Sequence, residues 1–184
     1  AVAPLAAQRL ATLDYASVAL VTLAFRARDV RLPTGSGFLV PPVERRLVKA
    51  MTASSAKWAW YGEAAPDLVL LRLSVGRHRE ERDLQRDDAE LTTAVRHDLA
   101  DLTGIAAEPV DTLVTRWGGS LPQYAVGHLD LVASVRADVA RLPGLAVCGA
   151  AYDGVGVPAC IASGQRAAAD VLGSLAVRPT EDNG

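Results

Sequence analysis

The sequence predicts an α/β (α+β) fold, with a mixed β-sheet and amphipathic helices. Four short apolar segments separated by turn residues predict strands in the first half of the chain. Two later segments carry apolar residues at helical spacing. A glycine-rich turn then joins a predicted buried strand to a closing helix, which is a pattern typical of α/β proteins.

Composition and charge exclude several classes of protein. The chain has 184 residues, half of them apolar, which is enough for one real core. Its formal charge of −2, from 19 basic and 21 acidic residues, gives no field for nucleic acid or an acidic membrane. The sequence contains no apolar run of the ~18 to 20 residues that a membrane span needs, and no signal peptide. We therefore expect a cytoplasmic protein.

The strands are expected in the first 75 residues, after a short helix from Pro4 to Thr12. The run from Ser17 to Phe25 is nearly all apolar, which predicts a strand buried on both faces. Three further segments read as strands, and turn residues separate them: Phe38–Val40, Leu47–Ala53 and Asp67–Val75.

Two amphipathic helices are expected next. Leu91, Val95 and Leu99 lie on one face of a helix over residues 88–104, which ends at Gly104. A second helix runs over residues 129–142 and stops at a Pro-Gly pair. Between them we expect a strand over residues 109–117, followed by an irregular segment over residues 117–128.

The stretch from Leu145 to Gly164 predicts a buried strand, a glycine-rich turn and the start of a helix from Pro158 to Leu175, whose apolar side faces a sheet. Glycines let a ligand approach the backbone closely, and a helix start presents free N–H groups and a positive dipole end. The turn is therefore a candidate binding site for an anionic or carbonyl-bearing cofactor. An ordinary turn that binds nothing is the alternative.

The two cysteines, Cys148 and Cys160, have no further cysteine or histidine at metal-ligand spacing. We expect them to be reduced and structural, and we predict no metal site. The sequence also shows no nucleophile paired with a base, so no catalytic residue is predicted.

Three segments carry a resemblance to a known family: Tyr15–Val21 with Ser36–Pro41, Arg116–Trp117 with Leu121–His128, and Gly149–Gly164. From Ala1 to about Leu175, the chain resembles the C-terminal half of the flavin-dependent coproporphyrinogen III and protoporphyrinogen oxidases, in the flavin amine oxidase superfamily. Its bias toward alanine, valine and arginine is similar to that of actinobacterial members, which implies coproporphyrinogen III as the substrate.

The resemblance implies an FAD-dependent, six-electron oxidation of a porphyrinogen to the porphyrin in haem biosynthesis, with O2 as acceptor and H2O2 as product. It implies flavin contacts and substrate contacts from two separate sets of residues. The FAD contacts are Trp117, Val155, Gly156 and Val157, and the substrate contacts are Phe38, Val40, Lys57 and Trp58.

The resemblance also implies the domain organisation. Residues 1–14 would end a strand and helix of a Rossmann-like FAD domain, 15–115 would form a substrate-binding domain with a mixed sheet and the helix 88–104, and 116–176 would return to the FAD domain. Residues 177–184 would be a disordered tail. The dinucleotide fingerprint of the family is missing from this sequence. We therefore expect a C-terminal portion, inactive alone, whose partner is the missing N-terminal half of the same enzyme.

Two other functions remain open from the sequence. One is a flavin amine oxidase-like enzyme, and the other is a truncated, non-catalytic domain that binds a porphyrin or a partner. Three residues near the predicted turn are expected to be structural. They are Tyr124, His128 and Asp153, and Asp153 is expected to order the turn by bonding backbone amides.

Overall fold

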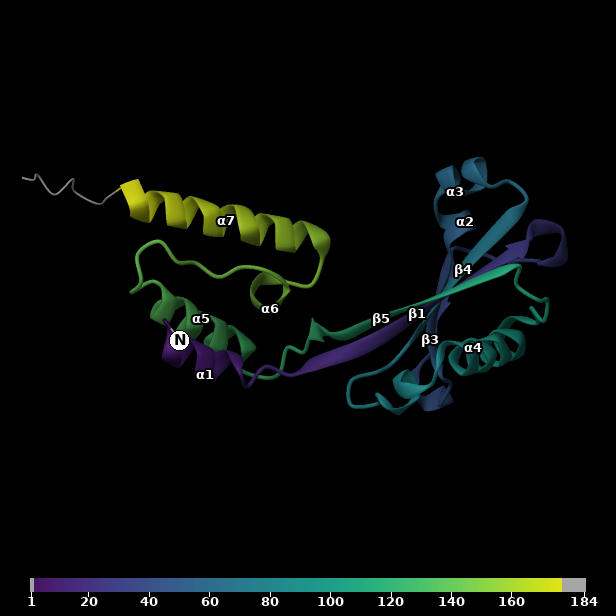
Figure 1. Cartoon of the computed structure of the whole chain (residues 1–184), viewed down its shortest axis with the longest axis horizontal. Helices are drawn as coiled ribbons and strands as arrows, with labels where there is room; N and C mark the ends of the chain where they lie inside the picture. The colour runs from purple at the N-terminus through teal and green to yellow at the C-terminus, as the bar shows by residue number, and fades with distance from the viewer. Residues whose placement is uncertain (1, 177–184) are drawn as a thin grey trace, which may run out of the picture. The chain divides into compact units, whose positions relative to one another are not determined.

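The computed structural model describes residues 2–176, which form two compact units (Figure 1). Unit 1 consists of the residues up to Tyr15 and those from Leu121 onward, and unit 2 consists of Ala16–Ser120. Two long strands, β1 (Tyr15–Arg26) and β5 (Asp111–Pro122), carry the chain into and out of unit 2.

Unit 2 is built on a five-stranded sheet in the order β2-β3-β4-β1-β5. Its three other strands are β2 (Gly37–Leu39), β3 (Val48–Ala53) and β4 (Leu68–Val75). β2 pairs with β3, β3 with β4, and β4 with β1, each time antiparallel. The predicted strands are therefore present. More than 40 residues separate β1 from β4 in the sequence, but the two strands are neighbours in the sheet. The strands between them in sequence, β2 and β3, lie on the other side of β4.

The two faces of this sheet differ in burial. Val21 and Leu23 of β1 are fully buried opposite Leu73 and Leu71 of β4. The alternating positions of the same strands are mostly half-buried or exposed. The expectation that β1 is buried on both faces was therefore wrong, because a helix covers only one face of the sheet. We call the covered face the core face and the other the open face.

The covering helix is α4 (Asp88–Thr103), and it follows the predicted apolar spacing. Leu91, Val95 and Leu99 are buried in the same cluster as the core-face residues of β1, β3 and β4. Asp87 accepts a hydrogen bond from the backbone N–H of Glu90 at the helix start. Gly104 ends the helix with φ of 76°, a conformation that glycine adopts at no steric cost.

Short helical segments fill the connections of unit 2. Two small helices, α2 (Ser54–Lys57) and α3 (Ala59–Ala64), join β3 to β4. Three 3-10 turns complete the connections: η1 (Ala27–Asp29), η2 (Pro42–Glu44) and η3 (Arg82–Gln85). The Ser55 hydroxyl accepts a hydrogen bond from the backbone N–H of Leu70, which fixes α2 to the start of β4.

β5 is longer than the sequence predicted. It extends to Pro122, whereas we expected an irregular segment from residue 117. The glycines at positions 118 and 119 do not end the strand, because the backbone N–H of Gly119 donates to the Ser17 hydroxyl of β1 at 3.0 Å. Neighbouring β1 therefore overrides the local preference of the glycines for a turn.

Unit 1 contains four helices among the described residues: α1 (Pro4–Leu10), α5 (His128–Val139), α6 (Ala150–Asp153) and α7 (Val157–Ala176). Ala6 of α1 is buried against Val135 and Val139 of α5 in a second, smaller core. An ion pair between Arg9 and Asp138 joins the same two helices. The two ends of the sequence thus form one packed unit.

The strand expected at residues 145–148 is absent. These residues are extended but belong to no sheet, and Cys148 is exposed rather than packed among apolar side chains. A strand needs a hydrogen-bonded neighbour, and the described part of unit 1 contains no strand beside this segment.

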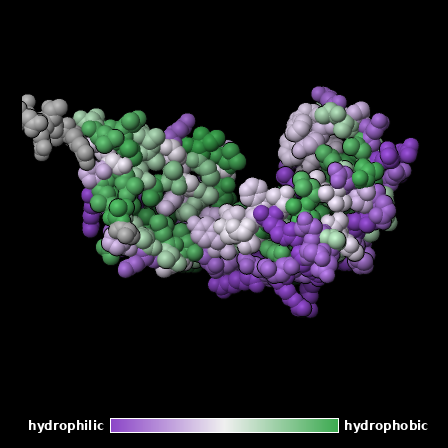
Figure 2. Space-filling model, viewed as in Figure 1, coloured by the Kyte–Doolittle hydropathy of each residue, from purple (hydrophilic) through white to green (hydrophobic). Residues whose placement is uncertain are grey.

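The apolar side of α7 is also exposed, although we expected it to face a sheet. Ile161, Leu172 and Leu175 are 57%, 68% and 47% exposed, and Figure 2 shows apolar surface along this helix. These three residues and three others lie on one side of the helix, and we call this surface the α7 stripe. Its residues are Val157, Ile161, Gly164, Ala168, Leu172 and Leu175.

Among residues 2–176, no helix has the length and apolar character that crossing a bilayer requires. The tail predicted over residues 177–184 lies outside the described residues.

Candidate functional site

The start of α7 presents free backbone donors. Val155, Gly156 and Val157 are exposed, and their N–H groups donate to no other group within the described chain. α7 is 20 residues long, so its first turn carries the positive end of a full helix dipole. This is the arrangement that the sequence predicted for these three residues, and it suits a carbonyl or anionic edge.

The turn before α7 is close-packed. Gly154 has φ of 127°, and a Cβ atom there would lie 3.2 Å from the Cβ of Ala159. Glycine therefore lets the turn fold back onto the first turn of α7.

Asp153 holds this turn through side chains. Its carboxylate accepts hydrogen bonds from Arg136 of α5 at 2.7 Å and from the Ser163 hydroxyl of α7 at 2.5 Å, and it pairs with Arg166 at 3.1 Å. The hydrogen bond from Arg136, followed by that from Ser163, lowers the pKa of Asp153 to about 2. We expected Asp153 to accept from backbone amides, and instead it joins two helices. Ser163 in turn accepts from the backbone N–H of Gly149.

Tyr124 and His128 form a stacked pair, with ring centroids 4.0 Å apart. The Tyr124 hydroxyl donates to the backbone carbonyl of Ala150, at the start of α6. His128 is buried at the first position of α5, and its Nε2 atom has no hydrogen-bond partner among the described residues. The pair therefore connects the start of α5 to the turn, as the structural roles predicted for both residues require.

Trp117 lies on β5 in unit 2, and 52% of its surface is exposed. This large apolar side chain belongs to neither of the two described hydrophobic cores, so it is available to contact a flat ligand. Trp117 and residues 155–157 belong to different units.

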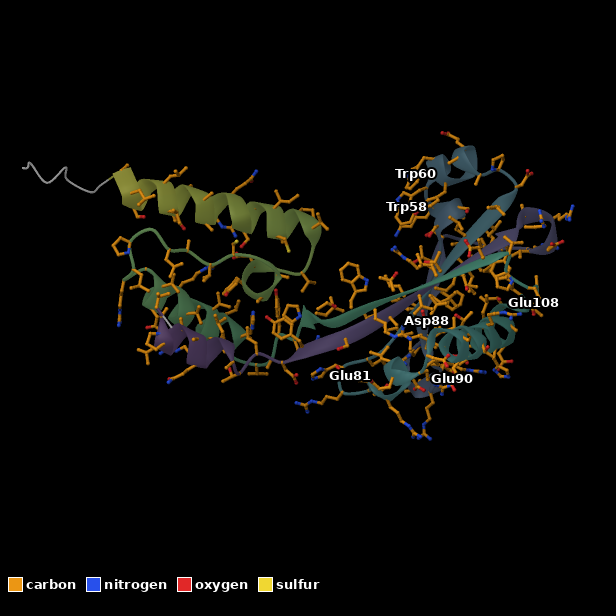
Figure 3. The ribbon with its side chains drawn as sticks, viewed as in Figure 1. Trp58, Trp60, Glu81, Asp88, Glu90 and Glu108 are labelled. Atoms are coloured by element: carbon orange, nitrogen blue, oxygen red, sulfur yellow. The ribbon has the colours of Figure 1, made fainter. Side chains whose placement is uncertain are left out.

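Aromatic side chains gather on the α2–α3 segment of unit 2 (Figure 3). The Lys57 ammonium lies 4.8 Å from the ring centroid of Trp58, and Trp58 lies 6.2 Å from Tyr61. Trp60 stacks on Tyr61 at 3.8 Å, and Trp60 is 58% exposed. The structure thus brings together Lys57 and Trp58, which the sequence predicted, with Trp60 and Tyr61, which it missed. The dense aromatic spacing Trp-Ala-Trp-Tyr was the available signal.

The other two predicted substrate contacts point elsewhere. Phe38 pairs with Met51 and packs against the main core, and Val40 is buried. Between them, Leu39 pairs with Ala50 on the open face and is 82% exposed. Because successive strand residues face opposite sides, a shift of one residue changes the face completely. Substrate contact by Phe38 and Val40 stays a prediction, and Leu39 is better placed for it.

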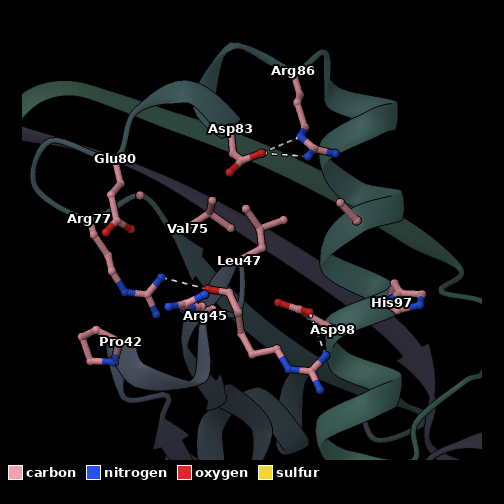
Figure 4. A pocket seen from close by; sticks show the side chains of 13 residues that line it. Pro42, Arg45, Leu47, Val75, Arg77, Glu80, Asp83, Arg86, His97 and Asp98 are labelled. Atoms are coloured by element: carbon pink, nitrogen blue, oxygen red, sulfur yellow. Dashed lines mark hydrogen bonds and ion pairs between the residues drawn. The ribbon is translucent and has the colours of Figure 1, made fainter.

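A cavity of about 610 Å³ lies beside α4 and contains many charged groups (Figure 4). Arg46 donates to Asp101 at 2.5 Å and to Asp98 at 3.5 Å, and Arg86 pairs with Asp83 at 2.7 Å. The hydrogen bond between Arg46 and Asp101 raises the pKa of Arg46 and lowers that of Asp101. The Arg46 pairs attach the segment before β3 to α4, whereas the Arg86–Asp83 pair joins neighbouring residues at η3, so this cavity is mainly a structural junction.

Three residues at this junction have potential metal ligands within 4.8 Å of one another: His97, Asp98 and Asp101. Arg46 already occupies both carboxylates, and the Asp98 carboxylate also accepts the backbone N–H of Val48 at 2.9 Å. A guanidinium in this position supplies the positive charge that a cation would bring, so the cluster gives no reason to revise the prediction that no metal is bound.

The features described so far lie within the part of the chain that one protein-family model matches. The family described as flavin containing amine oxidoreductase matches residues 2–172, and the chain belongs to this family.

Its relatives include porphyrinogen oxidases. The chain is 42% identical over 160 residues to a coproporphyrinogen III oxidase of Mycobacterium tuberculosis, covering 87% of this chain and 34% of the relative. It is 34% identical to a protoporphyrinogen oxidase of Bos taurus, covering 91% of this chain and 36% of the relative. A crystal structure provisionally named as a protoporphyrinogen oxidase, from Exiguobacterium, matches with a TM-score of 0.77 at 34% identity, over 92% of this chain and 36% of that one.

The chain thus spans about a third of the length of these relatives. Membership of the family implies a flavin cofactor. The residues at the start of α7 fit such a group, because their free N–H groups are complementary to the carbonyl and nitrogen acceptors of a flavin ring.

Proposed function

We propose that this chain is part of an FAD-dependent oxidase that converts coproporphyrinogen III to coproporphyrin III in haem biosynthesis, in the cytoplasm, with O2 as acceptor and H2O2 as product. Protoporphyrinogen IX is the alternative substrate. The observation that supports this proposal best is the identity of 42% to a coproporphyrinogen III oxidase over 87% of the chain.

The two units have separate roles in this proposal. The predicted domains 1–14, 15–115 and 116–176 have similar bounds, but residues 116–120 belong to unit 2. Unit 2 holds the porphyrinogen between the open face of its sheet and the aromatic residues of α2–α3. Unit 1 contributes the start of α7 to the flavin site, where Val155, Gly156 and Val157 donate N–H groups to the ring. Trp117, which belongs to unit 2, provides a flat apolar contact. The dinucleotide-binding part comes from polypeptide that matches the rest of the relatives' length, and the α7 stripe packs against it.

The bound FAD supplies the redox chemistry of the reaction. The residues of this chain bind and orient the cofactor and the substrate, and they exclude water from the site. N–H groups at a helix start favour negative charge at a ring placed against them, and this preference raises the reduction potential of such a ring. The ion pairs of Asp153 keep these donors in position before the ligand arrives, which removes part of the ordering cost of binding.

The proposal is tested on the protein purified from its own cells through an affinity tag on this chain. We expect a yellow preparation that releases FAD on denaturation and converts colourless coproporphyrinogen III to fluorescent porphyrin, with oxygen uptake and peroxide release. A colourless, folded preparation that oxidises no porphyrinogen contradicts the proposal. Peroxide release with amines, but not with porphyrinogens, would favour the amine oxidase-like alternative.

A pair of variants tests the flavin contact in the same preparation. Val155→Glu places a carboxylate beside the free N–H groups, so we expect less bound FAD per polypeptide. Val43→Glu makes the same change at an exposed valine of unit 2 and should leave the FAD content unchanged. Equal FAD content in the two variants would remove residues 155–157 from the flavin site.

A further inference from the structure

The register of the sheet identifies which side chains stand on the open face. β4 is the central strand, and its residues on this face are Leu70, Arg72 and Ser74. The partners of these positions in β1 and β3 are all uncharged: Leu20, Thr22, Ala24, Ala50 and Thr52. Leu39 of β2, opposite Ala50, continues the same face.

The paired positions in the middle of this face are those of the strand pairs whose register is described. Among them, Arg72 is the one charged residue. It lies directly between Thr22 of β1 and Thr52 of β3. The side chain is exposed, and no ion pair or hydrogen bond from its guanidinium to another described residue is formed. Most other arginines of unit 2 pair with a carboxylate or a carbonyl, as Arg46, Arg77, Arg86, Arg96 and Arg116 do.

The aromatic group of α2–α3 follows closely in the chain. β3 ends one residue after Thr52, and α2 and α3 bring Lys57, Trp58 and Trp60 to the end of the β3–β4 pair. Hydrogen bonding of Leu70 to Ser55 fixes this segment to β4 only two residues from Arg72. A flat apolar body and an acidic substituent can therefore be recognised from neighbouring parts of one surface.

From these observations we infer that Arg72 binds a carboxylate of the substrate and determines the preference for porphyrins with many acidic side chains. This inference rests on the proposed function, since it names the residue that recognises the substrate of the same site. The guanidinium forms a bidentate pair with a carboxylate, and the uncharged residues at the paired positions of β1 and β3 beside it leave it free to do so. Lys57, beside Trp58, is positioned for a second carboxylate.

The test is a titration of the full 184-residue chain with coproporphyrin III, the stable porphyrin with four propionates, followed by quenching of tryptophan fluorescence. We expect Arg72→Gln to weaken binding about tenfold or more, since hydrogen bonds between charged groups contribute at that level. Arg72→Lys, which keeps the charge but not the fork geometry, should retain part of the affinity. The tetramethyl ester of coproporphyrin III, which has no free carboxylate, should bind the wild type and Arg72→Gln equally.

Arg141→Gln is the matched control, because Arg141 is an exposed arginine of unit 1 and the net charge changes equally. It should bind coproporphyrin III as the wild type does, and urea unfolding should show that all variants remain folded. Equal affinity of wild type and Arg72→Gln for coproporphyrin III overturns the role of Arg72 and leaves the proposed oxidase intact. If the wild-type chain binds neither coproporphyrin III nor its tetramethyl ester, the porphyrin site on the open face is itself overturned. The proposed oxidase is tested independently, by the FAD content and the porphyrinogen oxidation of the protein purified from its own cells.

Discussion

Asp153 joins the turn before α7 to two helices, through Arg136 of α5 and through Ser163 and Arg166 of α7. We expect Asp153→Asn to lower the free energy of unfolding by about 1 kcal/mol at neutral pH, because exposed ion pairs contribute little individually and this carboxylate makes several contacts. Urea unfolding of the wild type and the variant measures the difference. Asp170→Asn, on α7 and without a described ion pair, should cost almost nothing.

The contribution of Asp153 also depends on pH. Its pKa is lowered from the ordinary 3.8 to about 2 in the folded protein, mainly by the hydrogen bond from Arg136. A lowered folded-state pKa means that the unfolded chain takes up the proton first, so the stabilisation is complete above pH 3.8 and is lost as the pH falls toward 2. The stability difference between wild type and Asp153→Asn should shrink across this interval. A difference that is constant between pH 5 and pH 2 would contradict the assignment.

Single residues show where sequence reasoning succeeded and where it failed. The free N–H groups of a helix that begins near Val157 and Pro158 follow from glycine and proline spacing, whereas the choice of residues 155–157 came from the family resemblance. The partners of Asp153 were not, since Arg136 and Arg166 lie 17 and 13 positions away and only packing brings them close. Arg72 was missed for a similar reason. Its significance depends on the absence of acids on two neighbouring strands, which no local pattern reveals.

Asp98 attaches α4 to the sheet. This buried carboxylate accepts the backbone N–H of Val48, at the start of β3, and the guanidinium of Arg46. Asp98→Ala leaves the N–H group of Val48 buried without a partner, so we expect the free energy of unfolding to fall by about 2 to 3 kcal/mol. The measurement is urea unfolding followed by circular dichroism.

Asp101→Ala provides the comparison for Asp98. Asp101 also pairs with Arg46, but its side chain is 40% exposed. Removing it should cost much less than removing Asp98, because solvent screens an exposed ion pair. Equal losses in the two variants would mean that burial of Asp98 has no part in attaching the helix.

At the level of elements, the sequence predicted every long helix and the five strands of the sheet, because hydrophobic spacing determines them locally. Its errors are those of context. β5 continues through two glycines since β1 supplies a neighbour, and residues 145–148 form no strand since none is beside them. The same apolar sequence therefore gives a strand or an irregular segment according to what lies next to it.

The α7 stripe leaves much apolar surface in contact with water in this 184-residue chain. We expect the chain to bind a hydrophobic dye and to self-associate, because surfaces of this kind drive association. The double variant Ile161→Lys, Leu172→Lys should reduce both dye fluorescence and the sedimentation coefficient, with little change in the free energy of unfolding.

Val43→Lys is the control for the stripe, since Val43 is an exposed apolar residue of unit 2 that does not belong to the stripe. It should change neither dye binding nor sedimentation. Unchanged behaviour of the double variant would contradict the conclusion that the stripe is the adhesive surface of the chain.

Unit 1 is assembled from both ends of the sequence, with unit 2 inserted between them. A ribosome makes the polypeptide from one end, so α1 leaves the tunnel more than 100 residues before α5, against which it packs. Unit 2 has all of its strands once Ser120 has emerged, and it is free to fold first. During that interval Val135 and Val139 of α5, against which Ala6 packs, have not yet emerged, and the hydrogen bond from the N–H of Gln123 to the carbonyl of Asp14 forms only as the second connecting strand ends. During synthesis, unit 2 can therefore fold before unit 1 is assembled.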